Sequence, residues 1–126
     1  MSIRLSDEEF ADLVDQALAT IAPCFQQYLQ NLIVEIQMLP TARTARPLHL
    51  KPNSLLLGVY HGVPLTRKSV DAPVDWPGRI ILFQRNIESI CQSKDEVVEQ
   101  VRRTVLHEVG HHFGMNEDDL ERLGYG

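Results

Sequence analysis

The amino-acid sequence predicts an α+β fold, in which N-terminal helices, a small sheet of about three strands and a C-terminal helix follow one another. Near both ends of the chain, apolar residues recur at the spacing of a helix, and the middle contains short aliphatic segments typical of strands. A chain of 126 residues is long enough for one hydrophobic core without disulfides. We therefore expect a single domain over residues 1–126.

A capping box predicts the start of the first helix. Ser6 and Glu9 have the spacing at which each side chain can bond the backbone N–H of the other residue. The apolar residues that follow at helical spacing are Phe10, Leu13, Val14, Ala17, Leu18 and Ile21. The helix should end near Pro23, and residues 23–30 could add a short second helix that begins with this proline.

Three aliphatic segments predict the strands, at residues 32–38, 55–60 and 79–83. Residues 79–83 are apolar at consecutive positions after Arg79, which is typical of a strand buried on both faces. Residues 41–54 are rich in Pro, Arg and Thr, so we expect an irregular connection between the first two strands.

Charge and composition limit the functional classes and cellular locations to be considered. The formal net charge is −5, whereas nucleic-acid binding requires a concentrated basic surface. The N-terminus lacks the apolar core of a signal peptide, and no stretch approaches the ~18 consecutive apolar residues of a membrane span. Cys24 and Cys91 lack metal or redox spacing, so we interpret them as free thiols. We expect a cytoplasmic protein without nucleic-acid or membrane partners.

The candidate metal-binding residues are predicted to lie on a helix near the C-terminus. Ser93 and Glu96 form a second capping box, and valines at helical spacing continue the helix toward residues 107–111. These five residues read His-Glu-Val-Gly-His and match the H-E-x-x-H pattern. Two histidines four residues apart lie one helical turn apart on one face, so His107 and His111 could both bind a zinc ion.

Glu108 is the candidate catalytic residue. It follows the first histidine directly, at an angle suited to hydrogen-bonding a water molecule on the metal instead of taking a ligand position. Zinc lowers the pKa of a bound water toward roughly 7, and a nearby carboxylate can then take up its proton as the water attacks a carbonyl. The pattern therefore predicts hydrolysis of an amide bond without a protein nucleophile.

Two glycines near the motif guide the search for a third zinc ligand. Gly110, inside the helix, indicates close packing against another element, and Gly114 is placed to turn the chain back toward the metal. Glu117 then has the spacing at which metzincins place their third histidine. Asp118 and Asp119 are competing ligands, and all three acids could instead cap a final helix. His112 is rotated about 100° from His111, so we do not expect it to bind the metal.

The chain resembles the small bacterial zincin-like metallopeptidases, also described as minimal zincins. Their characteristic H-E-x-x-H-H-F-G, acidic residue and Leu-Gly-Tyr-like tail correspond here to residues 107–114, Glu117 and residues 123–125. The resemblance extends upstream to residues 56–65, 79–83 and 102–106, so it spans roughly the last two thirds of the chain, and the first third is matched only loosely. It implies a compact α+β fold with His107, His111 and an acid near Glu117 as zinc ligands, although the family more often has Asp at that last position.

Two main hypotheses about function follow. In the first, the protein is a zinc-dependent metallopeptidase that holds an extended peptide or protein substrate by backbone pairing at a strand edge. In the second, it is a catalytically silent zinc-binding interaction module with the same geometry. Glu108 favours the first, because a structural zinc site needs no base and is normally closed by four protein ligands. A third possibility, a metal-dependent nuclease, fits the acidic chain less well. Separately, Tyr125 could stabilise an oxyanion if the C-terminal tail folded over the site.

Overall fold

The computed structural model describes residues 2–21, 26, 29, 32–41, 56–61, 78–112 and 114–122, apart from the side chains of His112 and Glu117. Its elements are α1 (Asp7–Ala19), β1 (Ile33–Gln37), β2 (Gly58–His61), β3 (Arg79–Phe83), α5 (Gln84–Ser89), α6 (Lys94–His112) and α7 (Glu117–Arg122). This order confirms the predicted α+β fold. Over the described residues, no helix combines the length and the apolar character needed to cross a membrane.

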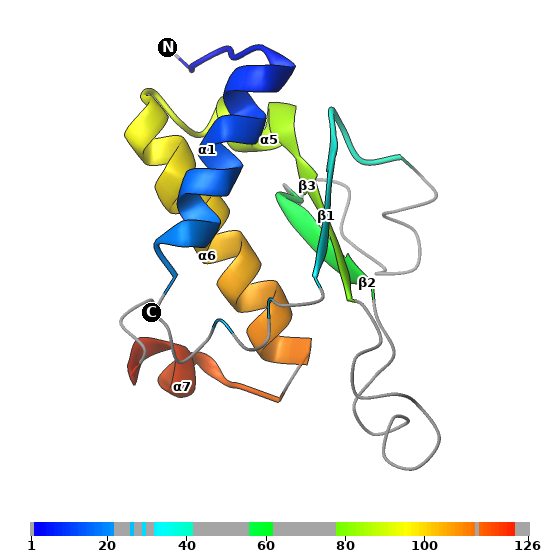
Figure 1. Ribbon diagram of the computed structural model, residues 1–126, viewed down its shortest axis with the longest axis vertical. Helices are drawn as coiled ribbons and strands as arrows, with labels where there is room; N and C mark the ends of the chain where they lie inside the picture. Colours follow the sequence, from blue (N-terminus) through cyan, green and yellow to red (C-terminus); the bar gives the residue numbers. More distant parts are fainter. Residues whose placement is uncertain are drawn as a thin grey trace.

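The sheet has the strand order β1-β3-β2, with β1 parallel and β2 antiparallel to the central strand β3. Ile80, Ile81, Leu82 and Phe83 are all buried, which confirms the prediction that this strand is covered on both faces. The helices α1 and α6 lie side by side along one face of the sheet (Figure 1). α6 therefore runs past the sheet with one side in the core and another side available to form a site.

The main core fills the space between these helices and the sheet. Ile80 and Leu82 of β3 point into it, because alternate residues of a strand face the same side. Its helical members include Phe10, Leu13, Val14, Ala17, Ile87, Val97, Val101, Val105, Leu106, Val109 and Leu120. On the other face of the sheet, Val59, Ile81 and Phe83 form a smaller cluster.

Both capping boxes form as predicted. In α1, the Glu9 N–H donates to Ser6 Oγ at 3.1 Å and the Ser6 N–H donates to Glu9 Oε1 at 3.1 Å. At α6, the Glu96 N–H donates to Ser93 Oγ and the Ser93 N–H donates to Glu96 Oε2, both at 3.2 Å. The second box fixes where α6 begins. The buried valines that follow pack into the core, so the residues on the opposite side of the helix face away from it.

The third strand has its predicted bounds, Arg79–Phe83, whereas the first two strands begin later than the sequence predicted. β1 starts at Ile33 instead of residue 32, and β2 starts at Gly58 instead of residue 55. The partner strand β3 ends at Phe83, and the carbonyl of Leu56 accepts a hydrogen bond of 2.7 Å from the side chain of Asn86 in α5 instead. The predicted second helix at residues 23–30 lies outside the described residues except for Gln26 and Leu29, as does most of the connection at 41–54.

The short helix α5 was not predicted. It begins immediately after β3 and has no side-chain cap, so neither a capping residue nor a loop marks it in the sequence. A buried carboxylate ties it to the N-terminal segment: Glu88 accepts bonds from the backbone N–H of Leu5 at 3.1 Å and from Gln84 Nε2 at 2.9 Å. Arg85 Nη1 lies 2.7 Å from the other oxygen of Glu88. These partners give Glu88 a structural role.

Candidate metal centre

His107 and His111 lie next to each other near the C-terminal end of α6. Their ring centroids are 5.8 Å apart and the ring planes are inclined by 80°. Two imidazoles bound through one nitrogen each to a shared tetrahedral zinc have centroids roughly 5 Å apart, as follows from a Zn–N distance of about 2.0–2.1 Å. The observed separation is close to this value, so the two rings are compatible with the metal that the motif implies.

The orientation of His107 is fixed by its own helix. Its Nδ1 lies 2.8 Å from the backbone carbonyl oxygen of Arg103. A carbonyl oxygen can only accept a hydrogen bond, so Nδ1 is the donor, and in the neutral imidazole this leaves the lone pair on Nε2. Histidines that bind metals usually donate their second ring nitrogen in this way, which fixes the tautomer and the direction of the ring. His107 is thus prepared to bind a metal through Nε2.

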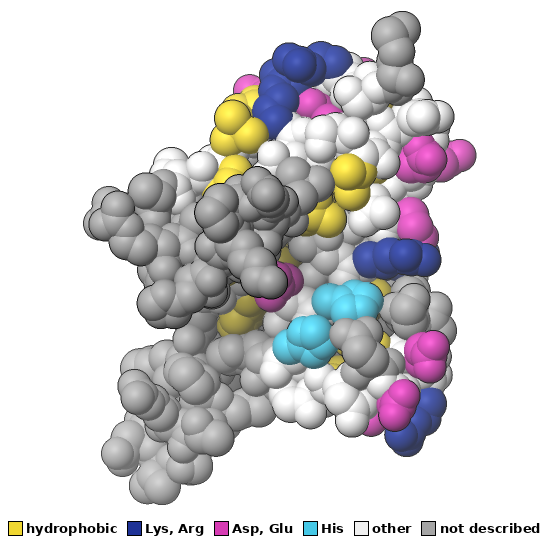
Figure 2. All heavy atoms as spheres, turned by 180° about the vertical axis from the view of Figure 1, so that it is seen from behind, with side chains coloured by type: hydrophobic (Ala, Val, Ile, Leu, Met, Phe, Trp, Pro, Cys, Tyr) yellow, Lys and Arg dark blue, Asp and Glu magenta, His cyan; other side chains and the backbone are white. Residues whose placement is uncertain are grey.

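Glu108 lies beside this pair in a groove. Burial raises the pKa of its carboxyl group, while the nearby His111 and His107 act in the opposite direction. Figure 2 shows two histidine side chains together on this face, with an acidic side chain on one side and a basic side chain on the other. A half-buried carboxylate with a raised pKa is suited to take up a proton, which is the chemistry required of a general base.

The groove has a volume of about 300 Å³ and lies between α6 and the start of β2. Leu56, Leu57 and Gly58 form one wall. The other wall consists of Gln100, Arg103, Thr104, His107 and Glu108, which recur every three to four residues and therefore share one face of the helix. The sequence pattern identified His107 and Glu108, but Gln100 and Arg103 were missed as site residues. Their spacing of seven and four residues before His107 was the available signal.

Gly58 allows β2 to approach α6 closely. A Cβ atom at this position would lie 2.8 Å from Thr104 Cγ2 and 3.1 Å from the backbone oxygen of Ile81. Thr104 cannot turn away easily, because its hydroxyl donates a hydrogen bond of 2.8 Å to the carbonyl of Gln100. The distance between the groove walls therefore depends on a glycine here.

We expect Gly58→Ala to destabilise the protein, because overpacking of a tight contact costs about 1–3 kcal/mol and outweighs the roughly 0.5–1 kcal/mol that alanine gains over glycine. Chemical denaturation measures this loss in the free energy of unfolding. The double variant Gly58→Ala with Thr104→Ser removes the clashing methyl group and should recover part of it. Equal stability of Gly58→Ala and the parent protein would contradict the close contact.

Gly114 ends α6 as the sequence predicted. Its φ is +82°, in the left-handed region that favours glycine. The N–H of Gly114 donates to the carbonyl of His111 at 3.1 Å, and the N–H of Met115 donates to the carbonyl of Gly110 at 2.8 Å. These two bonds form a Schellman motif, which satisfies carbonyl groups at the helix end and reverses the chain.

The chain then returns as α7, which packs against Gly110. A Cβ atom on Gly110 would lie 2.9 Å from Cδ2 of the buried Leu120, and this confirms the predicted close approach of another element. Asn116 caps α7: its Oδ1 accepts from the Asp119 N–H at 2.9 Å, and its own N–H donates to Asp119 Oδ2 at 3.0 Å. Asp119 therefore takes part in the helix cap. This is the alternative role that the sequence indicated for the three acids at residues 117–119.

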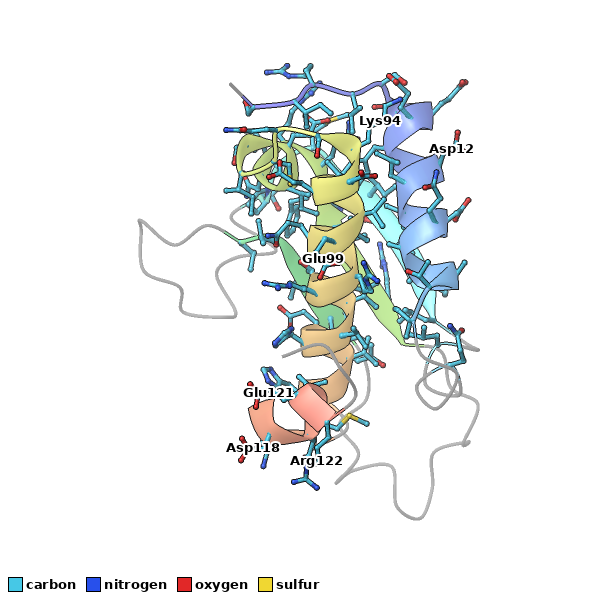
Figure 3. The ribbon with its side chains drawn as sticks, turned by 90° about the vertical axis from the view of Figure 1, so that its left-hand side faces the viewer. Asp12, Lys94, Glu99, Asp118, Glu121 and Arg122 are labelled. Atoms are coloured by element: carbon cyan, nitrogen blue, oxygen red, sulfur yellow. The ribbon has the colours of Figure 1, made fainter. Side chains whose placement is uncertain are left out.

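The candidate third ligands lie at the start of α7. Glu117 is the first residue of α7, directly after the turn, but its side chain lies outside the described residues. Asp118 is exposed, and Figure 3 shows it with Glu121 and Arg122 on α7, beyond the end of α6. Among the described side chains, no three His, Cys, Asp or Glu residues are grouped closely enough to hold a metal. Tyr125 also lies outside the described residues.

Comparison with known proteins identifies a matching family model and a similar fold. A family model described as zincin-like metallopeptidase matches residues 29–126. A solved structure of a conserved hypothetical protein from Thermus thermophilus has a similar fold, with a TM-score of 0.55 and 21% sequence identity over 86% of this chain and 94% of that chain. No curated protein matches the chain.

Proposed function

This chain belongs to the zincin-like metallopeptidase family, and we propose that it is a zinc-dependent peptidase in which Glu108 acts as general base. The observation that carries the proposal is the pair of adjacent imidazoles, with His107 oriented through Nδ1, next to the half-buried carboxylate of Glu108. A carboxylate at this place is not needed to hold a structural zinc ion, whereas hydrolysis requires a base beside the metal.

In this proposal, His107 and His111 bind the zinc ion, and Glu117 supplies a third, oxygen ligand from the start of α7. When bound, zinc acts as a Lewis acid toward a carbonyl group and makes water more acidic. Glu108 accepts a proton from the attacking water and passes it to the amine that leaves. The turn at Gly114 and the packing of Leu120 on Gly110 hold α7, and with it the backbone of Glu117, close to the end of α6.

A peptide or protein is the proposed substrate, and two features of the groove support it. β2 is an outer strand of the three described strands and forms one end of the groove wall, so an extended chain could pair with its backbone. Leu56 and Leu57 offer apolar contacts beside it. We further propose a cytoplasmic location, with which the buried free thiol of Cys91 is compatible.

The proposal is tested by incubating the zinc-loaded protein with a mixed peptide library and identifying products by mass spectrometry. Cleavage should disappear when zinc is removed by a chelator and return when zinc is added. Cleavage that continues at full rate in the metal-free protein would contradict the proposal.

The third ligand can be identified by comparing two single variants. We expect Glu117→Ala to weaken zinc binding much more than Asp118→Ala, because Asp118 is exposed whereas Glu117 directly follows the turn. Competition with a fluorescent zinc chelator measures both affinities. Equal effects would indicate a shared acidic cluster or a cap, and a larger effect of Asp118→Ala would assign the ligand to that residue.

A further inference from the structure

The groove extends beyond the proposed metal site along α6. Gln100 precedes His107 by seven residues, which corresponds to about 10 Å along a helix that rises 1.5 Å per residue. Arg103 lies between them, one helical turn before His107, and lines the same groove. This part of the groove has no role in the proposed chemistry of water activation.

The guanidinium group of Arg103 is only partly neutralised. Its side chain is 51% exposed, and its Nε lies 3.3 Å from Glu99 Oε1 in an intrahelical pair. The other oxygen of Glu99 contacts Nη2 of Arg102, so one carboxylate is shared between two guanidinium groups. Exposed pairs of this kind are weak, and a carboxylate entering the groove can compete with Glu99 for Arg103.

We propose that Arg103 selects substrates that carry a carboxylate group within about two residues of the cleaved bond. This inference rests on the proposed peptidase function and names the class of its substrates. Arg103 is about 6 Å from His107 along the helix axis, which equals roughly two residues of an extended peptide at 3.3 Å per residue. The carboxylate can be an Asp or Glu side chain or the C-terminal group of a short peptide.

The chemistry of the groove suits this ligand. A guanidinium group presents a planar fork of N–H donors that matches both oxygens of a carboxylate, and such charge-assisted bonds are stronger than neutral ones. Leu57 can contact the aliphatic part of an acidic side chain, and Gln100 offers a further amide group beside the guanidinium.

The test uses peptides that carry a hydroxamate, a bidentate zinc ligand, at one end. The hydroxamate anchors each probe at the metal, so the first and second residues from it have known positions. Two series are needed, one with the hydroxamate at the C-terminus and one with it at the N-terminus. Each series has Gly, Asp, Asn or Lys at the tested position, and the second also compares a free C-terminal carboxylate with an amide. Dissociation constants are measured by isothermal titration calorimetry with the full zinc-loaded chain.

We expect the Asp probe or the free-carboxylate probe to bind roughly 3- to 10-fold more tightly than its neutral counterpart at one position, as for a partly exposed charge-assisted pair. Preference for Asp with either terminus would assign a side-chain site, and preference only for the free terminus would assign a carboxypeptidase-like site. Arg103→Gln should abolish the preference, and Arg103→Glu should reverse it in favour of Lys.

Zinc affinity should be unchanged in both Arg103 variants, because His107 is bonded to the backbone carbonyl of residue 103 and not to its side chain. Lys94→Gln is the matched control. It removes the same charge from the same helix, nine residues earlier, where Lys94 pairs with Glu9 at 3.4 Å. Lys94 and Glu99 are labelled in Figure 3, at the start and near the middle of α6. This variant should keep the full preference.

Equal binding of charged and neutral probes by the parent protein would overturn the inference, and so would a preference that survives Arg103→Gln. Failure of the proposed function has a different signature. If the Gly hydroxamate did not bind the zinc-loaded protein at all, the metal centre itself would be wrong, and the inference would be rejected with it. Binding of the Gly probe without any preference for a carboxylate would leave the peptidase proposal intact.

Discussion

Glu108→Gln is expected to lower zinc-dependent peptide hydrolysis by at least about 100-fold, since general-base catalysis typically contributes 10²–10⁴-fold. Glutamine has nearly the same shape as glutamate but cannot take up a proton. Burial already raises the pKa of Glu108, so a neutral side chain is well accommodated at this position. The fold and the bound metal should therefore be preserved, and only the rate should fall.

This experiment requires matched zinc content and the same peptide library for both proteins. Glu99→Gln is a suitable control, because it makes the same chemical change on the same helix at a 44% exposed side chain. The Glu99→Gln variant should cleave peptides without charged side chains at the same rate as the parent protein. Hydrolysis that continues unchanged in Glu108→Gln would mean that a contaminant or another base is responsible.

Replacing the histidines should have the second large effect. The parent protein is expected to bind about one zinc ion per chain, and His107→Ala or His111→Ala should each weaken binding beyond the roughly 10- to 100-fold typical for loss of an outer-shell partner. The double variant should hold no zinc at this helix. Thermal unfolding should change little in the absence of metal, because His111 is exposed and His107 is only half-buried.

The matched control for this measurement is His61→Ala, an exposed histidine at the end of β2. It removes one imidazole from the chain but not from α6, so zinc binding should be unaffected. Metal analysis after dialysis gives the zinc content of all the variants and the parent. One zinc ion per chain in the double variant would mean that the metal is bound somewhere other than α6.

Much of the fold could be predicted because local signals agree with the tertiary structure. The capping boxes at Ser6 and Ser93 form as the spacing indicates, and the central strand is recognised by its consecutive apolar residues. The role of Gly114 was also predictable, since left-handed backbone at a helix end favours glycine. In each case a few neighbouring residues determine the structure.

The features that were missed depend on contacts between distant segments. β2 begins at Gly58 because its partner β3 ends at Phe83, and the preceding Leu56 carbonyl bonds instead to Asn86, thirty residues away in the chain. α5 lacks a cap and is fixed by a buried bond between Glu88 and Leu5. Arg103 became a site residue only when α6 and β2 were seen to form one groove. Helical spacing alone places Arg103 on the same face of α6 as His107, but it does not reveal the opposite wall of the groove.

The central claim is that His107 and His111 together bind a zinc ion on α6. The most direct test is the anomalous difference map of a crystal of the zinc-loaded protein, recorded at the zinc absorption edge. We predict a single strong peak per chain, about 2.0–2.1 Å from Nε2 of both histidines. A peak bound elsewhere, or no peak between these two rings in a protein shown to contain zinc, would contradict it.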